Sequence, residues 1–108
     1  MTEVEIWRLV DRATETTVGE IHVEDMDYPW LTGRFAALPG FGSFRPLFDA
    51  LSDRLETEDW DGFERVHRRI DAALALHRPE HGAVPDYLIR LDGDEAAFRW
   101  ADAPFPAL

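Results

Sequence analysis

Two stretches in the middle of the chain have helical spacing of apolar residues, and this limits the fold more than any other feature. In residues 44–56 the apolar positions recur three or four residues apart and share one face. They are Phe44, Leu47, Phe48, Leu51 and Leu55. The same spacing continues over residues 59–77, until Pro79 prevents further helix. We therefore expect helices over residues 44–56 and 59–77.

Segments with strand character lie on both sides of these helices. Residues 4–10 are rich in β-branched and aromatic types, residues 18–24 alternate between apolar and polar, and residues 31–37 predict a short third strand. Residues 86–91 and 96–101 predict a second hairpin. The order ββ(β)ααββ predicts an α+β fold, an antiparallel sheet of four to five strands with two helices packed on one face. We expect one domain over residues 1–108, with residues 103–108 as an extended tail.

The charge balance excludes several classes of function. The chain has 22 Asp and Glu residues against 11 cationic residues, all of them arginine, and no cysteine. A net charge of −11 opposes direct binding to nucleic acid or to an anionic membrane, and the lack of cysteine excludes disulfides and thiolate metal sites. No apolar run approaches the roughly 18 residues of a membrane span, and the acidic N-terminus does not resemble a signal peptide. We expect a cytoplasmic protein with no cofactor.

The unmatched carboxylates gather in three clusters. These are Glu24, Asp25 and Asp27; Glu56, Glu58, Asp59 and Asp61; and Asp92, Asp94 and Glu95. They suit solvated loops and helix starts, and together they also suit an acidic surface that attracts a basic partner. Our first hypothesis is a non-enzymatic protein-interaction module, like an immunity or inhibitor protein, with residues 56–61 in the binding surface. An exposed sheet edge also allows a homodimer.

Two histidines support an alternative hypothesis. His67 lies on the apolar stripe of the second helix with Asp71 one turn later, an arrangement that suits either a packed histidine or an acid–base pair. His22 lies on the polar face of a strand, beside carboxylates. The alternative is a small enzyme or ligand-binding protein with a pocket between sheet and helices, lined by Trp30 and Phe41. Without a convincing catalytic constellation, we favour the non-enzymatic hypothesis.

Residues 77–81, His-Arg-Pro-Glu-His, match the H-x-x-E-H pattern of a family of zinc proteases. That chemistry needs both histidines on one face of a continuous helix, and Pro79 breaks the helix inside the motif. We therefore predict no metal site, and the only candidates for a surface site are His77, Glu80 and His81.

The segments PWLTGRFAALPGFGSFRPLFDAL and IRLDGDEAAFRW resemble a group of small uncharacterised proteins of high-GC bacteria. The resemblance covers most of the chain, and the absence of Lys and Asn agrees with such a genome. It implies no activity, so it adds no catalytic residue.

Overall fold

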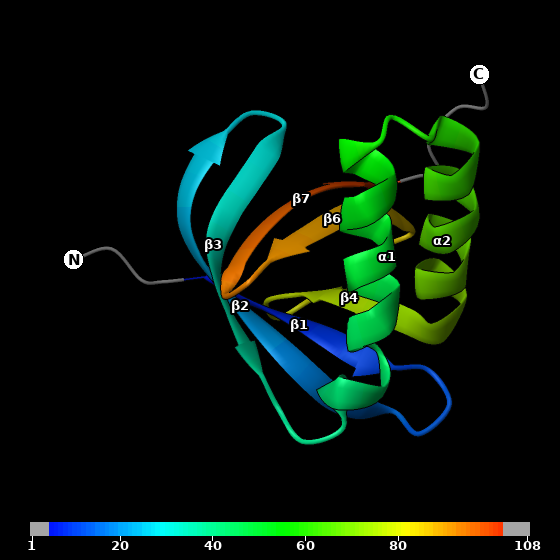
Figure 1. Cartoon of the computed structure of the whole chain (residues 1–108). Helices are drawn as coiled ribbons and strands as arrows, with labels where there is room; N and C mark the ends of the chain where they lie inside the picture. The colour runs from blue at the N-terminus through cyan, green and yellow to red at the C-terminus, as the bar shows by residue number, and fades with distance from the viewer. Residues whose placement is uncertain (1–4, 103–108) are drawn as a thin grey trace.

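The computed structural model describes residues 5–102 and contains two α-helices and one antiparallel sheet of seven strands (Figure 1). The strands are β1 (Ile6–Asp11), β2 (Thr16–Asp27), β3 (Trp30–Ala37), β4 (Leu74–Arg78), β5 (Gly82–Ala83), β6 (Asp86–Asp92) and β7 (Glu95–Ala101). The helices are the short 3-10 helix η1 (Phe41–Ser43), α1 (Arg45–Glu56) and α2 (Trp60–Ala73). The strand order is β5-β4-β1-β2-β3-β7-β6, so the mixed α+β class is confirmed.

The predicted sheet of four to five strands was too small, because the second helix ends earlier than its apolar spacing suggested. α2 stops at Ala73, and the chain continues directly into β4. Leu76 of β4 pairs with Leu9 of β1, and Leu74 and Leu76 are both fully buried. Alanine and leucine favour helix locally, but pairing with β1 overrides that propensity. The short β5, which pairs with β4, was also not predicted.

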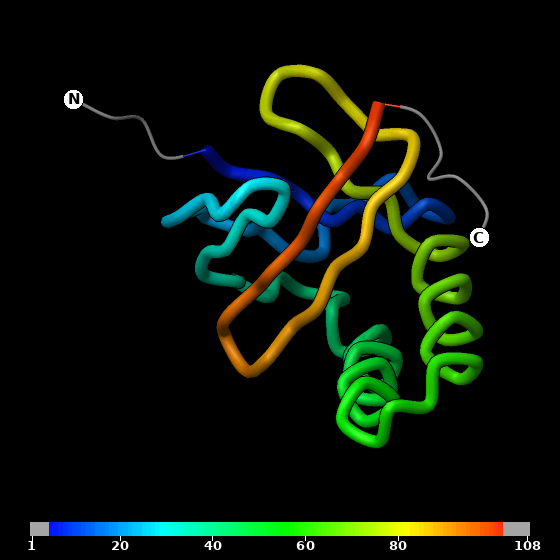
Figure 2. The backbone as a smooth tube through the Cα atoms, turned by 90° about the horizontal axis from the view of Figure 1, so that it is seen from above, coloured from blue at the N-terminus to red at the C-terminus, as the bar shows by residue number. Residues whose placement is uncertain are grey.

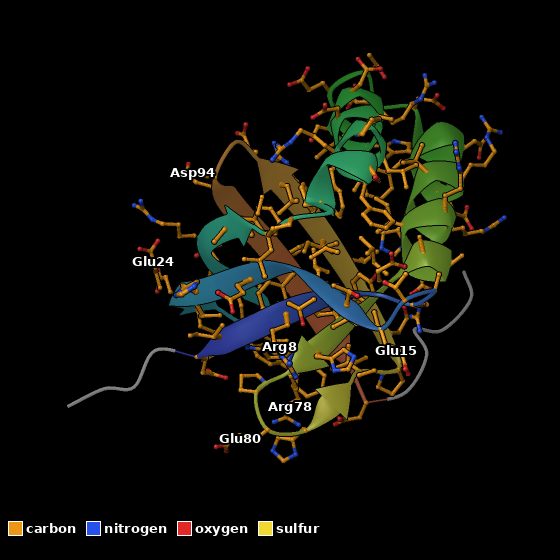
Figure 3. The ribbon with its side chains drawn as sticks, turned by 90° about the horizontal axis from the view of Figure 1, so that it is seen from below. Arg8, Glu15, Glu24, Arg78, Glu80 and Asp94 are labelled. Atoms are coloured by element: carbon orange, nitrogen blue, oxygen red, sulfur yellow. The ribbon has the colours of Figure 1, made fainter. Side chains whose placement is uncertain are left out.

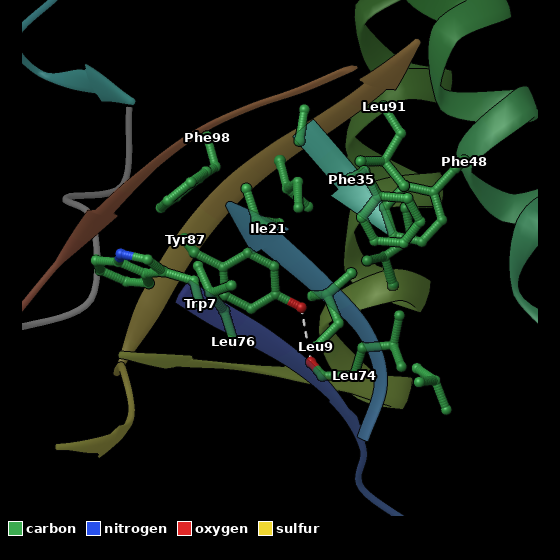
Figure 4. Packing of buried hydrophobic residues seen from close by; sticks show 14 of the residues in the cluster. Trp7, Leu9, Ile21, Phe35, Phe48, Leu74, Leu76, Tyr87, Leu91 and Phe98 are labelled. Atoms are coloured by element: carbon green, nitrogen blue, oxygen red, sulfur yellow. Dashed lines mark hydrogen bonds between the residues drawn. The ribbon is translucent and has the colours of Figure 1, made fainter. Parts of the chain in front are cut away.

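The sheet curls until its two ends meet. β4 and β6 are separated by β1, β2, β3 and β7 in the strand order, yet the hydroxyl of Tyr87 in β6 donates a 2.6 Å hydrogen bond to the carbonyl oxygen of Leu74 in β4 (Figure 4). Trp7 of β1 packs against Phe98 of β7, with ring centroids 4.9 Å apart. The concave face therefore encloses a core lined from several strands at once, as in a barrel that is not fully closed.

The two helices cover one end of this curled sheet, and both lie on the same side of it in Figure 1. They bury Phe48, Leu51 and Ile70 in the core. Ser52 of α1 donates a 3.2 Å hydrogen bond to the carbonyl oxygen of Leu91 in β6, so α1 lies along the edge strand that has no strand partner on that side. This contact protects an edge that would otherwise pair with another chain.

The β2–β3 hairpin is longer than its neighbours and extends past β1. β2 pairs with β1 only as far as His22, while its pairing with β3 continues to Asp27. A register shift after Val23 bends the hairpin, and Gly33 lies opposite this point. A Cβ atom at Gly33 would overlap the carbonyl oxygen of His22, so the two strands approach too closely for any other residue. The projecting end forms part of the site described below.

Within residues 5–102, neither helix has the length and apolar character that a membrane crossing needs.

Candidate functional site

A cavity of about 570 Å³ lies at the mouth of the curled sheet, and we call it the tryptophan pocket. Its lining comes from the start of β1, the β2–β3 hairpin, the end of β4 and the end of β7. These residues are Glu5, Trp7, Met26, Tyr28, Pro29, Leu31, Arg78, Arg99, Trp100, Ala101 and Asp102. Figure 2 shows the β4–β5 hairpin beside the C-terminal end of β7. The pocket has the volume and the mixed aromatic and polar lining of a small-molecule site.

Strand alternation places several of these side chains on the inner face of the sheet. Trp7 is two residues from buried Leu9, and Trp100 is two residues from buried Phe98. Arg78 is two residues beyond Leu76 in the same way. Side chains two residues apart in a strand share a face. The pocket residues therefore lie on the same face of their strands as the buried core residues, next to them along each strand.

The floor of the pocket contains a polar atom without a partner. Trp7 is only 2% exposed, and its Nε1–H group is buried and makes no hydrogen bond. Figure 4 shows its indole at one end of the core cluster, beyond Tyr87. A buried donor left without an acceptor costs about 1–3 kcal/mol, so native proteins rarely leave one unpaired without a reason.

The wall of the pocket contains a stacked arginine. The guanidinium carbon of Arg78 lies 4.5 Å from the centroid of the Trp100 ring, and the Trp100 ring is 5.7 Å from that of Trp7. Among the described residues, Arg78 makes no ion pair with a carboxylate. A guanidinium stacked on an indole keeps its N–H groups, which lie in its own plane, available as hydrogen-bond donors.

The proposed acid–base pair of His67 and Asp71 is not assembled as a catalytic pair. His67 is half-buried, stacked on Phe63 and edge-on to Tyr87 at 5.9 Å. Asp71 instead pairs with Arg12, at 3.6 Å. Burial lowers the pKa of the His67 imidazole, and the nearby carboxylates and the Tyr87 backbone oppose this shift less strongly. The ring contacts fit the packed histidine that the sequence also allowed, but its buried Nε2 makes no hydrogen bond.

The remaining residues of the predicted pocket do not come together. His22 lies on the outer face, with Nε2 3.5 Å from the Glu20 carboxylate. Trp30 is partly exposed at the start of β3, whereas Phe41 is 1% exposed and packs against Phe35 at 4.7 Å. Phe41 therefore belongs to the core, and the tryptophan pocket lies at the mouth of the sheet rather than between sheet and helices.

The cluster at residues 56–61 has structural roles at the junction between α1 and α2. Asp59 accepts a 3.0 Å hydrogen bond from the Gly62 backbone and caps α2, and it also pairs with Arg54 at 3.4 Å. Glu58 has the left-handed φ of 55°. Glu56 ends α1, and Asp61 lies in the first turn of α2, where a negative charge is favourable.

One residue of the first cluster and two residues of the third line the same cavity, which the sequence did not indicate. Glu24 lies with Asp92 and Glu95 around a second cavity of about 350 Å³, which also contains Arg90 and which we call the acidic groove. In Figure 3, Glu24 and Asp94 project on the same side of the molecule. Strands β3 and β7 pair between the two clusters and bring them together.

The H-x-x-E-H segment does not lie on a helix. His77 is in β4, and Glu80 and His81 are in the turn that leads to β5. Figure 3 shows Glu80 at the tip of this hairpin, beyond Arg78. Burial and the charges of Arg8 and Arg12 lower the pKa of His77. Within the described part of the chain, no group of three or more acidic or histidine side chains is arranged to hold a metal ion.

Comparison with protein-family models, with curated proteins and with solved structures finds no match. The resemblance to small proteins of high-GC bacteria therefore stays a prediction.

The pocket residues Trp7, Arg78 and Trp100 were not predicted as site residues. The strand spacing of Leu74, Leu76 and Arg78 contained the signal, but the sequence assigned these residues to the end of a helix and its connection.

Proposed function

We propose that this protein is a non-enzymatic binding protein for a small organic ligand, which it holds in the tryptophan pocket. The observation that carries the proposal is the unpaired, buried N–H of Trp7 in the floor of a 570 Å³ cavity. A ligand acceptor would satisfy this donor, and the aromatic walls would bury the rest of the ligand. Among the described lining residues the candidate bases are the exposed carboxylates of Glu5 and Asp102. No histidine, serine or threonine lies with them in the lining, which favours binding over catalysis.

The test follows the four indole N–H signals in a two-dimensional NMR spectrum while a library of small organic acids, amides and amines is added. A ligand in the pocket will shift the signals of Trp7 and Trp100. Trp60, 57% exposed on α2, is the internal control and will stay in place. The variants Trp7→Phe and Trp100→Phe identify the two signals. A library that leaves both signals unmoved, or moves Trp60 equally, contradicts the proposal.

The acidic groove supports a second candidate function, the binding of a basic partner. Its observation is the meeting of Glu24 with Asp92 and Glu95. We expect an oligo-arginine peptide to bind the triple variant of these residues, changed to Gln, Asn and Gln, more weakly than the wild type. A control with the same loss of charge changes Glu56, Glu58 and Asp61 to their amides. Equal weakening in both would mean that net charge, rather than the groove, attracts the peptide.

A further inference from the structure

We infer that the tryptophan pocket selects flat organic anions, with a carboxylate on an aromatic ring as the chemical class. This inference rests on the proposed function and names the ligand class for the same site. The first observation that supports it is the burial of the arginine side chains. All 11 lie within the described residues; nine are exposed, and the two half-buried ones, Arg78 and Arg99, both line this pocket. A chain with a net charge of −11 therefore places both of its sheltered cations at one cavity.

Arg78 is already arranged to receive a carboxylate. Its guanidinium stacks on Trp100, so its orientation is fixed before any ligand arrives. The N–H groups lie in the guanidinium plane and can form the paired hydrogen bonds that arginine makes with a carboxylate. Elsewhere in the described chain, exposed arginines such as Arg12, Arg54 and Arg68 are paired with acids, but Arg78 is not.

The acidic residues of the pocket are exposed, so solvent screens their effect on the half-buried cation. Glu5 and Asp102 are exposed, whereas Trp7 is buried and Arg78 is half-buried. The hydrogen-bond donors Trp7 and Arg78 are thus more buried than the carboxylate acceptors Glu5 and Asp102. A ligand would enter with its negative group first, toward Arg78 and the N–H of Trp7.

The aromatic side chains that line the pocket indicate that the ligand contains an aromatic ring. Trp100 in β7 and Tyr28 in the β2–β3 turn supply aromatic surface, and Met26 in β2 adds a flexible apolar side chain. Because Trp7 Nε1 is closed off from solvent, an acceptor reaches it only when a neighbour moves. Trp100 is half-buried and lines the pocket, so a ligand bound there will change its NMR signal and its fluorescence.

The experiment compares three ligands with one naphthalene ring: the carboxylate, the carboxamide and the methylamine. Affinities come from NMR titration of the indole signals and from calorimetry at low salt. We expect the carboxylate to bind about 10- to 100-fold more tightly than the amide, and the amine to bind most weakly. Arg78→Met should reduce carboxylate affinity to that of the amide. Arg65→Met, which removes an exposed arginine of α2 that does not line the pocket, should leave it unchanged.

The outcomes distinguish a failure of the ligand class from a failure of the binding function. If the amide or amine binds in the pocket as tightly as the carboxylate, or if Arg78→Met binds like the wild type, the ligand class is wrong and the binding function stands. If none of the three ligands and no library compound shifts the Trp7 and Trp100 signals, both proposals fail. Arg78→Lys retains the charge without the paired hydrogen bonds, and it gives the same test, with a partial loss of affinity, if the methionine variant does not fold.

Discussion

Replacing Tyr87 by phenylalanine removes a single oxygen atom and tests how the ends of the sheet are joined. Tyr87 is 0% exposed, and its hydroxyl donates to the Leu74 carbonyl oxygen at 2.6 Å. This bond links β6 to β4, which do not pair in the sheet. If the link stabilises the curl, its loss will lower the free energy of unfolding without changing the ring that fills the core.

The expected magnitude follows from the environment of the bond. A neutral hydrogen bond contributes about 0.5–1.5 kcal/mol net, and a buried acceptor left without its donor costs about 1–3 kcal/mol. We expect Tyr87→Phe to lose about 2 kcal/mol. For a domain of this size each kcal/mol shifts the melting temperature by about 4–8 °C, so the midpoint should fall by about 8–16 °C.

Urea unfolding followed by tryptophan fluorescence and circular dichroism measures the change. The matched control is Tyr28→Phe, because Tyr28 is 88% exposed and should change stability by less than about 0.5 kcal/mol. A loss in Tyr87→Phe no larger than in this control would refute the reasoning.

Alkaline pH gives an independent check of the same residue. Burial raises the pKa of the Tyr87 phenol. The unfolded chain therefore releases this proton near pH 10 while the folded chain still holds it, and stability should fall as pH rises above about 10. That part of the fall should vanish in Tyr87→Phe.

Three further predictions test local features. Gly33→Ala should lose about 1–3 kcal/mol or more, because its Cβ would overlap the β2 backbone, whereas Gly42→Ala, with open space around it, should be nearly neutral in the same urea titration. Glu58→Gly should gain about 0.5–1 kcal/mol in thermal unfolding, because a left-handed conformation is costly for glutamate; a loss would contradict this. Burial lowers the pKa of His67 in the folded protein, so the unfolded chain takes up a proton first as pH falls below 6.5, and the free energy of unfolding decreases. His67→Phe should therefore make the free energy of unfolding less dependent on pH between pH 7 and 5. An unchanged slope would count against this prediction.

The first helix and most strands could be predicted because their periodicity is local. The stripe of residues 44–56 corresponds to α1, and the alternating segments correspond to β1, β2, β6 and β7. Residues 31–37 form β3, which is a full strand of eight residues. The apolar spacing within each segment predicts its secondary structure, because each segment buries one face against the core.

The end of α2 could not be predicted in this way. Residues 72–76, Ala-Ala-Leu-Ala-Leu, suit the end of a helix as well as a buried strand, and only the pairing of Leu76 with Leu9 decides between them. The curl had no local signal either, since the Tyr87–Leu74 bond joins residues on strands that are not neighbours. The site depends on both features, and this is why His67, Trp30 and Phe41 were proposed in place of the pocket residues.

The position of Arg78 explains why the mouth of the sheet forms a pocket rather than more core. In β4, Leu74 and Leu76 are fully buried and Arg78 comes next on the same face. In β7, Phe98 is fully buried and Trp100, next in its row, is only half-buried. The inward-facing side chains of β4 and β7 thus become polar or more exposed at the same end of the sheet. This end lies away from the helices. A leucine in place of Arg78 would have continued the core, so the arginine marks the layer where burial stops.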